Sequence, residues 1–266
     1  MRININFYCD NKFLLPIQYN HLVQSFIYNN INKKIANFLH EKGFELNKRN
    51  FKLFSFSRIN GKIDVIKIKQ EYFLLIKNFF NFILSSPYEE FITSFALNLS
   101  ENNKKLLLGE NIVQIYSIDV LFEPEFKENM KIKMLSPITI YSTLNDAIGN
   151  KKTYYYNPWE KEFEILVKEN LIKKMIAFNN FNNLVDDINN PSMLKNSDYF
   201  ENKNFFIKPY KVMKKDEKII NYKDTIIKAW FGEYLISGDI DLIKISYYCG
   251  LGSKNSQGFG LYEILN

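Results

Sequence analysis

A glycine-rich segment near the C-terminal end constrains the fold of this chain more than any other stretch. Residues 249–265 contain four of its ten glycines, together with one lysine, Lys254, and four polar side chains. Glycine allows positive φ angles and the close approach of another backbone, so such a loop can turn several N–H groups onto phosphate oxygens while Lys254 supplies charge. The segment therefore predicts a partner that carries phosphate. The alternative is a tight connection into a final strand.

Two nucleotide-binding motifs are excluded by the spacing of these glycines. A dinucleotide fingerprint requires a third glycine where Asn255 stands, followed by a helix and a strand, for which too few residues remain. A Walker loop ends in Gly-Lys-Ser or Gly-Lys-Thr, whereas Gly258 is followed by Phe259.

The bulk composition is that of a folded protein without cofactor signals. The chain has 266 residues, 46% of them hydrophobic and 24% charged, which suits one large or two ordinary domains. No apolar run reaches the roughly 18 residues of a membrane span, and the N-terminus lacks a signal-peptide block, so we expect a cytoplasmic protein that binds no membrane. Two cysteines and two histidines are too few for a zinc cluster or a histidine-rich site. We therefore predict metal-free catalysis and no cofactor.

The net charge of +6 is unevenly distributed. Residues 203–228 hold eight lysines against three acidic residues, and residues 33–52 hold six basic against two acidic residues. Basic segments beside aromatic residues are what a nucleic-acid backbone requires, although charged runs are commonly just solvated faces.

The order of predicted elements indicates two similar halves. In the first half we expect strands at 1–9, 51–58, 71–85 and 112–121, a helical region at 21–43 and a helix at 88–100. Residues 123–129 interrupt this βαββαβ order and predict a linker. The sequence therefore predicts an α+β protein with two tandem ferredoxin-like, RRM-like domains, at 1–122 and 130–266, the second ending in the glycine-rich loop.

In the second half we expect a strand at 131–141, a helix from Asn157 and Pro158 to about 178, strands near 205–213 and 218–235, a short helix at 239–248 and a last strand. Residues 179–204 are rich in Asn and Asp and predict an inserted loop. Its Asp186-Asp187 pair could suggest a metal, but a solvated loop is the simpler interpretation.

Several short motifs at both ends of the chain occur in one order. They read LPIQYNHL at 15–22, IYN at 27–29, FLHE at 38–41, FKLFSFSR at 51–58, SPI at 136–138 and finally Gly-apolar-Gly, a lysine-bearing linker and Gly-apolar-Gly at 250–260. This set resembles the CRISPR-associated endoribonucleases of the Cas6 family, within the RAMP superfamily, which cut the repeat in precursor guide RNA. The resemblance implies metal-independent cleavage through the 2′-hydroxyl of RNA, with a 2′,3′-cyclic phosphate and a 5′-hydroxyl as products.

The first helical region carries the residues on which this chemistry would depend. In one straight helix Tyr28 and His40 would lie roughly 18 Å apart and about 120° around the axis, too far to share a site. Residues 29–32 are poor helix formers and Asn32 can cap a second helix, so we expect a break that folds His40 back towards Tyr28.

By the resemblance, His40 is the general acid or base, Tyr28 is a proton partner or orienting group, and Lys52 is the cation on the non-bridging oxygens. The loop between His40 and Lys52 can vary in length, so three other residues could supply that cation: Lys42, Lys48 and Arg49. Without the resemblance, a helix-end histidine, a half-buried tyrosine and an edge-strand lysine would count as structural. We interpret His21 as structural.

The expected RNA contacts come from the glycine-rich loop and from nearby basic residues. The residues are Gly250, Gly252, Lys254, Asn255, Ser256, Gly258, Gly260, Lys208, Lys211 and Arg58. The expected partner is CRISPR repeat RNA, in precursor or mature guide RNA, and association with other CRISPR effector subunits or as a homodimer stays open.

Three other functions compete with this hypothesis. The first is a catalytically silent repeat-RNA binder on the same fold, and the second is a small-molecule phosphate enzyme that uses the glycine-rich loop. The third is a conventional RNA-recognition module, since residues 257–264 overlap a ribonucleoprotein consensus, but Leu261 and Ile264 stand where stacking aromatics are expected.

Overall fold

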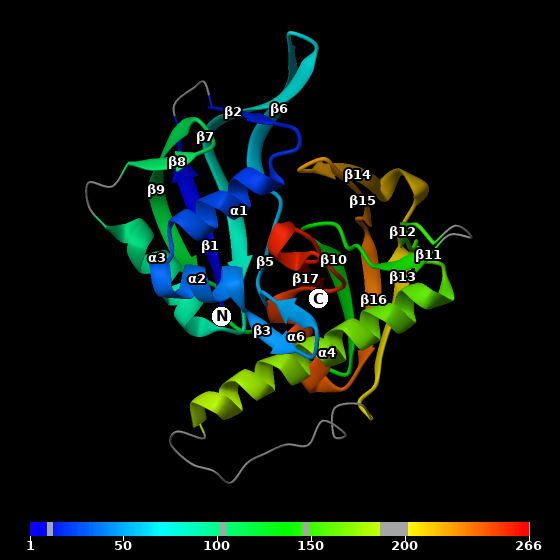
Figure 1. The fold of residues 1–266 in the computed structure, drawn as a ribbon. Helices are drawn as coiled ribbons and strands as arrows, with labels where there is room; N and C mark the ends of the chain where they lie inside the picture. Colours follow the sequence, from blue (N-terminus) through cyan, green and yellow to red (C-terminus); the bar gives the residue numbers. More distant parts are fainter. Residues whose placement is uncertain (10–12, 102–104, 146–148, 187–201, 266) are drawn as a thin grey trace.

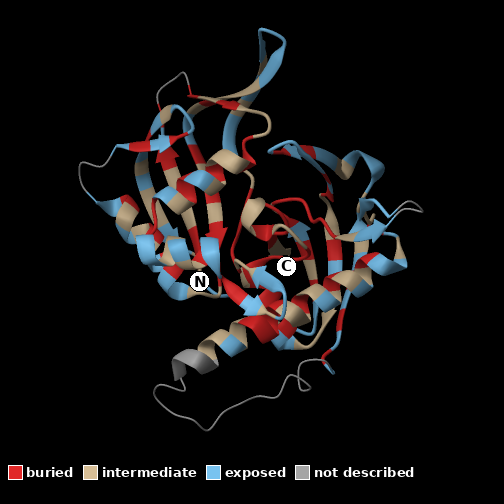
Figure 2. Cartoon of the chain, in the orientation of Figure 1, coloured by how far each residue is buried: buried red, intermediate tan, exposed pale blue. Residues whose placement is uncertain are grey.

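The chain forms two larger β-sheets with helices packed against them, in a computed structural model that describes residues 1–9, 13–101, 105–145, 149–186 and 202–265 (Figure 1). Three two-stranded sheets complete the described part of the chain. The glycine-rich loop lies between the two halves. Buried residues follow the sheets, the inner faces of the helices and this loop (Figure 2).

The first half has the strand order of a ferredoxin-like domain. Antiparallel strands are arranged as β9–β1–β7, and β6 and β5 pair with the other edge of β7. Alternating residues Ile3, Ile5 and Phe7 of β1 are buried, as the period of a half-buried strand requires. The elements are β1 (Arg2–Tyr8), β2 (Phe13–Pro16), α1 (Asn20–Asn29), α2 (Lys33–Glu41), β3 (Phe44–Leu46), β4 (Arg49–Phe51), β5 (Ser55–Phe56), β6 (Asn60–Ile68), β7 (Glu71–Ser85), α3 (Glu89–Ser100), β8 (Leu106–Leu108) and β9 (Asn111–Val120).

The second half repeats this order as β13–β16–β10–β17, again antiparallel. Its elements are β10 (Asn129–Met134), β11 (Tyr141–Asn145), β12 (Lys151–Tyr155), α4 (Lys161–Asp186), β13 (Phe205–Lys211), η1 (Lys214–Asp216), β14 (Glu217–Tyr222), β15 (Thr225–Trp230), β16 (Glu233–Gly238), α6 (Ile240–Cys249), η2 (Asn255–Gln257) and β17 (Tyr262–Leu265). The predicted α+β fold with two tandem ferredoxin-like units is confirmed. The exact domain boundaries stay a prediction, and β10 begins at Asn129, the last residue of the predicted linker.

Three predicted strands differ from the structure. The strand predicted near 218–235 is divided into β14, β15 and β16, with positive φ angles at Lys223, Asp224 and Gly232 in the connections. The strand predicted at 51–58 is divided into β4 and β5, because Leu53 has a positive φ of 49° and the chain turns there. The strand predicted at 131–141 ends at Met134, and Tyr141 begins a separate hairpin of β11 and β12.

The helix predicted to start at Asn157 begins at Lys161 instead. The Asn157 side chain accepts the N–H of Trp159 at 3.0 Å, and the Glu160 N–H donates to the Asn157 carbonyl at 3.1 Å, so these residues close a turn before the helix.

Helix α4 also continues beyond the predicted end at 178, to Asp186, so the first part of the predicted loop at 179–204 is helical. Phe178 and Phe181 of α4 contact Phe44, with ring centroids 5.9 and 4.8 Å apart, which accounts for the extra turns. These contacts join α4 to the first half of the chain (Figure 1). Most of the rest of that loop, with Asp187, lies outside the described residues.

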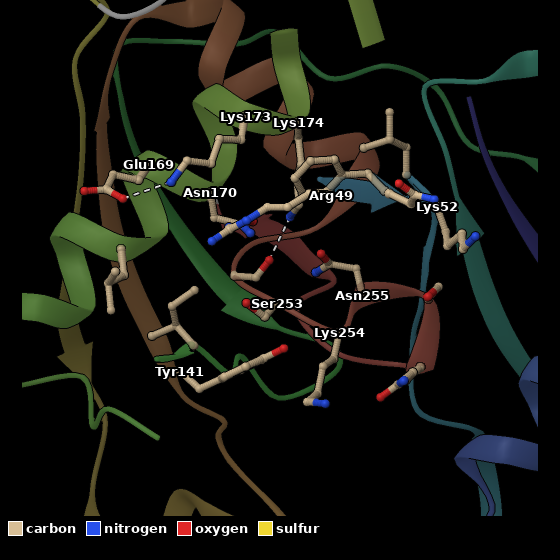
Figure 3. Close-up of a pocket in the computed structure, with 18 of the residues that line it drawn as sticks. Arg49, Lys52, Tyr141, Glu169, Asn170, Lys173, Lys174, Ser253, Lys254 and Asn255 are labelled. Atoms are coloured by element: carbon tan, nitrogen blue, oxygen red, sulfur yellow. Dashed lines mark hydrogen bonds and ion pairs between the residues drawn. The ribbon is translucent and has the colours of Figure 1, made fainter. Parts of the chain in front are cut away.

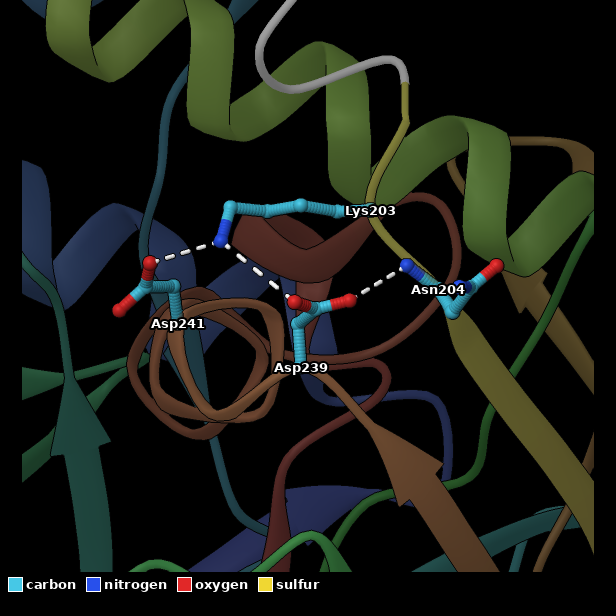
Figure 4. A network of polar contacts seen from close by, with 4 residues as sticks. All are labelled: Lys203, Asn204, Asp239 and Asp241. Atoms are coloured by element: carbon cyan, nitrogen blue, oxygen red, sulfur yellow. Dashed lines mark hydrogen bonds and ion pairs between the residues drawn. The ribbon is translucent and has the colours of Figure 1, made fainter.

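A lysine network fixes the chain where it enters β13. The ammonium of Lys203 lies 2.9 Å from the carboxylate of Asp241 and 3.7 Å from that of Asp239, at the start of α6 (Figure 4). Asp239 also accepts the N–H of Asn204 at 2.6 Å. The network anchors this end of the segment between α4 and β13.

A buried arginine joins the two halves. Arg2 of β1 donates to the carbonyls of Tyr262, at 2.7 Å, and Tyr247, and its guanidinium lies 3.2 Å from the centroid of the Tyr247 ring. Burial lowers the pKa of Arg2 to about 10, so the group stays charged at neutral pH.

We expect Arg2→Ala to lower the free energy of unfolding by about 2–4 kcal/mol, because it leaves buried carbonyls unpaired and opens a cavity between the halves. Urea unfolding followed by circular dichroism measures the change. Lys208→Ala, on an exposed position, is the control and should change stability by less than about 0.5 kcal/mol. Equal stability of both variants would show that Arg2 does not hold the halves together.

Candidate active site

The glycine-rich loop folds onto α1 of the first half. The Asn20 side chain donates to the Gln257 carbonyl at 2.7 Å, and the Gln24 side chain donates to the Ser256 carbonyl at 2.7 Å. The side-chain oxygen of Gln24, Oε1, in turn accepts a hydrogen bond from the hydroxyl of Tyr222 in the β14–β15 hairpin. Three separate parts of the chain thus meet at the tip of the loop.

Two side chains, one in the loop and one on α4, fix the conformation of the loop. The Asn255 amide donates to the carbonyls of Leu251, at 2.9 Å, and Phe259, at 3.0 Å. Lys174 of α4 donates to the carbonyls of Gly250 and Gly252, both at 2.8 Å. Burial lowers the pKa of Lys174 to about 8. Sequence reasoning missed Lys174, because no local spacing shows which loop a helix side chain will reach.

The loop glycines pack closely against other residues of this chain. All four have positive φ, and a Cβ at Gly252 would overlap the Thr139 carbonyl, while one at Gly258 would overlap the Phe56 ring. The N–H groups of Gly250, Gly258 and Gly260 donate to carbonyls of the same chain. The expectation that glycine N–H groups face outward is therefore wrong for these three, and the glycines shape the loop.

A cavity of about 740 Å³ lies beside the loop, between α4 and the β3–β4 hairpin (Figure 3). Five cationic side chains line it: Arg49, Lys52, Lys173, Lys174 and Lys254. Glu169 is the acidic residue of the wall, and it pairs with Lys173 at 3.0 Å. Such a surplus of positive charge in a concave site suits a phosphate-bearing ligand.

Lys254 and Tyr141 form one side of this cavity. The Lys254 ammonium lies 5.1 Å from the centroid of the Tyr141 ring, within the range of a cation–π contact. Partial burial lowers the pKa of Lys254. The predicted loop cation therefore lines the cavity, together with Asn255 and Ser256.

The predicted helix break is confirmed. Helix α1 ends at Asn29, α2 begins at Lys33, and the Asn32 side chain caps α2 by accepting the Lys34 N–H at 2.8 Å.

The segment 52–54 contains Lys52 and contacts the backbone of His40 and the ring of Tyr28. Lys52 lines the cavity and donates to the backbone carbonyl of His40 at 3.2 Å, and desolvation lowers its pKa. Phe54 packs edge to face against Tyr28, with ring centroids 5.9 Å apart. Burial raises the pKa of Tyr28 to about 12.

His40 and Tyr28 do not line the cavity themselves. His40 is exposed near the C-terminal end of α2, and Tyr28 is half-buried. Among the alternative cations, Arg49 lines the cavity with Lys52, whereas Lys42 and Lys48 are exposed residues outside its wall.

The other predicted RNA contacts are dispersed. Arg58 is engaged within the protein, where it donates to Asn20 and lies 4.2 Å from the centroid of the Tyr19 ring. Lys208 and Lys211 are exposed on β13, outside the wall of the cavity, and Lys211 pairs with Glu233 at 3.4 Å.

Within the described ranges, no three His, Cys, Asp or Glu side chains gather as a metal site would require. In the same part of the chain, no helix combines the length and apolar character needed to cross a membrane.

Comparison with known proteins agrees with this architecture. The family model described as "CRISPR associated protein Cas6, C-terminal" matches residues 121–264. A protein of Methanocaldococcus jannaschii named "CRISPR-associated endoribonuclease Cas6 1" is 31% identical over 261 residues, which are 98% of this chain and 91% of that protein. The chain belongs to the Cas6 family.

A second curated Cas6 protein and a solved Cas6 structure are similar over nearly the whole chain. The "CRISPR-associated endoribonuclease Cas6" of Pyrococcus furiosus is 28% identical, covering 96% of this chain and 85% of that protein. A solved structure titled "CRISPR associated protein Cas6" superposes with a TM-score of 0.74 at 28% identity, covering 100% of this chain and 99% of the other. The likeness to Cas6 therefore extends over both ferredoxin-like units.

Proposed function

We propose that this chain is an endoribonuclease that cuts within CRISPR repeats of precursor guide RNA. The observation that carries the proposal is the contact between Lys52, in the wall of a cationic cavity, and the carbonyl of His40. The Cas6 relatives named as endoribonucleases support the substrate class.

In the proposed mechanism the RNA supplies its own nucleophile. The 2′-hydroxyl attacks the adjacent phosphate, the bond to the 5′ oxygen breaks, and the products carry a 2′,3′-cyclic phosphate and a 5′-hydroxyl. One group must accept the proton of the 2′-hydroxyl, and one must protonate the departing oxygen. No metal ion is required for these steps.

Each predicted residue suits one of these tasks. Histidine can give or take a proton at neutral pH, so His40 serves as general acid or base. Tyr28, with a pKa of about 12, stays protonated and can orient or donate but is not a base. Lys52 supplies positive charge to the crowded phosphorane, and Arg49 shares the cavity with it.

The test is cleavage of repeat RNA, transcribed from the CRISPR array of the source genome, by the pure protein in EDTA. We expect one discrete cut whose upstream product resists 3′-end labelling until the cyclic phosphate is removed. A scrambled RNA of equal length is the control. Cleavage that stops in EDTA and returns with Mg²⁺ would contradict the metal-independent mechanism.

A catalytically silent repeat-RNA binder is the second candidate. It is favoured by the exposed position of His40, outside the cavity wall. Tight repeat binding without any cut, in single-turnover reactions with excess protein, would support this candidate.

A further inference from the structure

Three aromatic side chains form an exposed cluster on adjacent strands of the first sheet. They are Tyr8 of β1, Phe79 of β7 and Tyr116 of β9, with exposed fractions of 37%, 51% and 71%. The ring centroids of Tyr8 and Phe79 lie 5.4 Å apart, and those of Phe79 and Tyr116 lie 5.2 Å apart. None of these three residues lines the cationic cavity. The aromatic cluster is therefore a separate surface that a ligand can reach.

The aromatic cluster lies on the sheet face that points away from α1 and α3. Phe7 is buried and meets Phe26 of α1, with ring centroids 5.7 Å apart, and Phe26 meets Phe95 of α3 at 6.1 Å. Successive side chains of a strand point to opposite faces of the sheet, so Tyr8 points away from these helices. Phe79 lies directly opposite Tyr8 in the register of β1 with β7.

Two β-bulges bring the other two rings onto this face. Tyr116 has no partner where the register of β1 with β9 shifts by one residue. In β7, Asn78 and Phe79 are passed over where the register with β6 shifts, and Asn78 has a positive φ of 57°. Bulges re-aim side chains and are over-represented beside active sites. Two bulges at one exposed cluster indicate a surface that is shaped for a ligand.

The chemistry of the rings suits unpaired nucleobases. In the first sheet β1 and β7 are neighbours between β9 and β6, so Tyr8 and Phe79 lie on its central strands. RNA-recognition modules, which have the same βαββαβ order, stack two or three bases on aromatic side chains of their sheet. The rings carry no charge, so they suit the flat face of a base rather than a phosphate.

Two lysines beside the rings favour RNA over a protein as the ligand. Lys62 and Lys77 face each other in the register of β6 with β7, and Lys77 is two residues before Phe79. Lys77 also pairs with Asp64 at 2.5 Å. Like charges directly opposite each other destabilise a sheet, and a phosphate of the RNA backbone between the two ammonium groups would offset their repulsion.

We propose that Tyr8, Phe79 and Tyr116 form a stacking platform that binds unpaired bases of the repeat RNA, at a distance from the cavity where cleavage is proposed. The inference rests on the proposed function in taking repeat RNA as the ligand. Stacking accepts every base, so the platform holds the strand without reading its sequence.

Photochemical cross-linking with the full chain tests the platform. Repeat RNA carries one 5-iodopyrimidine, placed at each pyrimidine position in turn, and a 2′-deoxynucleotide at the scissile position keeps the RNA intact. Irradiation couples the iodinated base to an aromatic ring stacked on it, and mass spectrometry of the digested complex identifies the residue. We expect adducts at Tyr8, Phe79 or Tyr116 from one short stretch of the repeat.

Filter binding with substituted proteins measures what the platform contributes. Phe79→Ala and Tyr116→Ala should each weaken repeat binding by about 5- to 150-fold, the value of one lost base stack. Phe79→Leu keeps an apolar side chain but removes the ring face, so it should weaken binding nearly as much. Phe122→Ala is the matched control, because Phe122 is 96% exposed and lies outside the aromatic cluster, and it should bind like the parent.

The salt dependence separates stacking from charge. The platform rings contact bases, so the slope of log affinity against log salt should be the same in Phe79→Ala as in the parent. A slope reduced by about 0.7 in Phe79→Ala would mean that a phosphate contact was lost instead, and would overturn the assignment to bases.

The remaining outcomes distinguish the platform from the proposed function. Platform variants that fold and bind the repeat as tightly as Phe122→Ala overturn the inference, as do adducts confined to the cavity wall, and a repeat that is still cut leaves the proposed function intact. Adducts at the aromatic cluster of a protein that never cuts the repeat support the inference and overturn the proposed cleavage. A parent that binds no repeat RNA overturns both.

A second copy of the chain is the competing occupant of this face, and sedimentation of the parent and of Phe79→Ala tests it. We expect the same oligomeric state for both proteins. A dimeric parent and a monomeric Phe79→Ala with unchanged RNA affinity would assign the face to a second copy and overturn the inference.

Discussion

His40→Ala should slow repeat cleavage by about 10²- to 10⁴-fold, the usual worth of a general acid or base. The substitution removes the imidazole but keeps the backbone carbonyl that accepts the Lys52 ammonium, so the cavity wall is preserved. Repeat affinity should change little, because His40 lies outside the cavity wall. Single-turnover rates with excess protein measure the effect on the chemical step alone.

His21→Ala is the matched control, since His21 is the other histidine of the chain and contacts the edge of the Tyr222 ring. It should cleave at nearly the parent rate. Lys52→Ala should lose less activity than His40→Ala, because Arg49 lines the same cavity, and the double variant should lose more than either single one. A full single-turnover rate in His40→Ala would remove His40 from the mechanism.

Gly258→Val should weaken repeat binding by more than about 10-fold through displacement of the glycine-rich loop. Its φ is 85°, and a side chain there would overlap Phe56 and Asn20, so backbone strain and overpacking together should cost about 2–5 kcal/mol. Filter binding gives the affinity, and thermal unfolding followed by circular dichroism shows whether the fold persists.

Gly149→Val is the matched control for the backbone strain of Gly258→Val. Gly149 has the same φ of 85°, but a Cβ there would meet no atom within 4 Å, so this variant carries the backbone strain without the overlap. It should bind RNA like the parent. If Gly258→Val folds and binds RNA as tightly as Gly149→Val, the loop does not position RNA.

Lys254→Ala separates charge from loop shape. It should leave stability nearly unchanged, weaken binding less than Gly258→Val, and reduce the slope of log affinity against log salt by about 0.7 to 0.9, the value for one phosphate contact. An unchanged slope would mean that Lys254 does not contact phosphate.

The sequence was sufficient for the features that depend on local patterns. The break between α1 and α2 follows from Asn32, whose side chain can cap only a helix that begins after it. Strand β1 followed from alternating apolar residues, Ile3, Ile5 and Phe7, whereas β6, most of whose residues are exposed, was not predicted.

Features set by distant contacts could not be predicted. The extension of α4 depends on Phe178 and Phe181 meeting Phe44, more than a hundred residues earlier. Gly252 and Gly258 of the loop are required by Thr139 and Phe56, and no spacing within the loop points to either of these residues.

The same limit applies to the site. Sequence motifs indicated His40, Tyr28 and Lys52, and their joint role in catalysis stays a prediction. In the structure Lys52 contacts the backbone carbonyl of His40, and Tyr28 packs against Phe54. The contribution of α4, through Asn170 and Lys174, has no sequence signal, because it depends on how the helix crosses the loop.

The proposed attack by the 2′-hydroxyl has one direct test. Repeat RNA with a single 2′-deoxynucleotide immediately upstream of the scissile phosphate removes the nucleophile and leaves every phosphate in place. In EDTA we expect this RNA to bind with nearly the affinity of the parent RNA and to remain uncut, whereas the same substitution one nucleotide downstream should leave cleavage intact. Cutting of the first substrate at the original position would contradict the mechanism, whatever the behaviour of the protein variants.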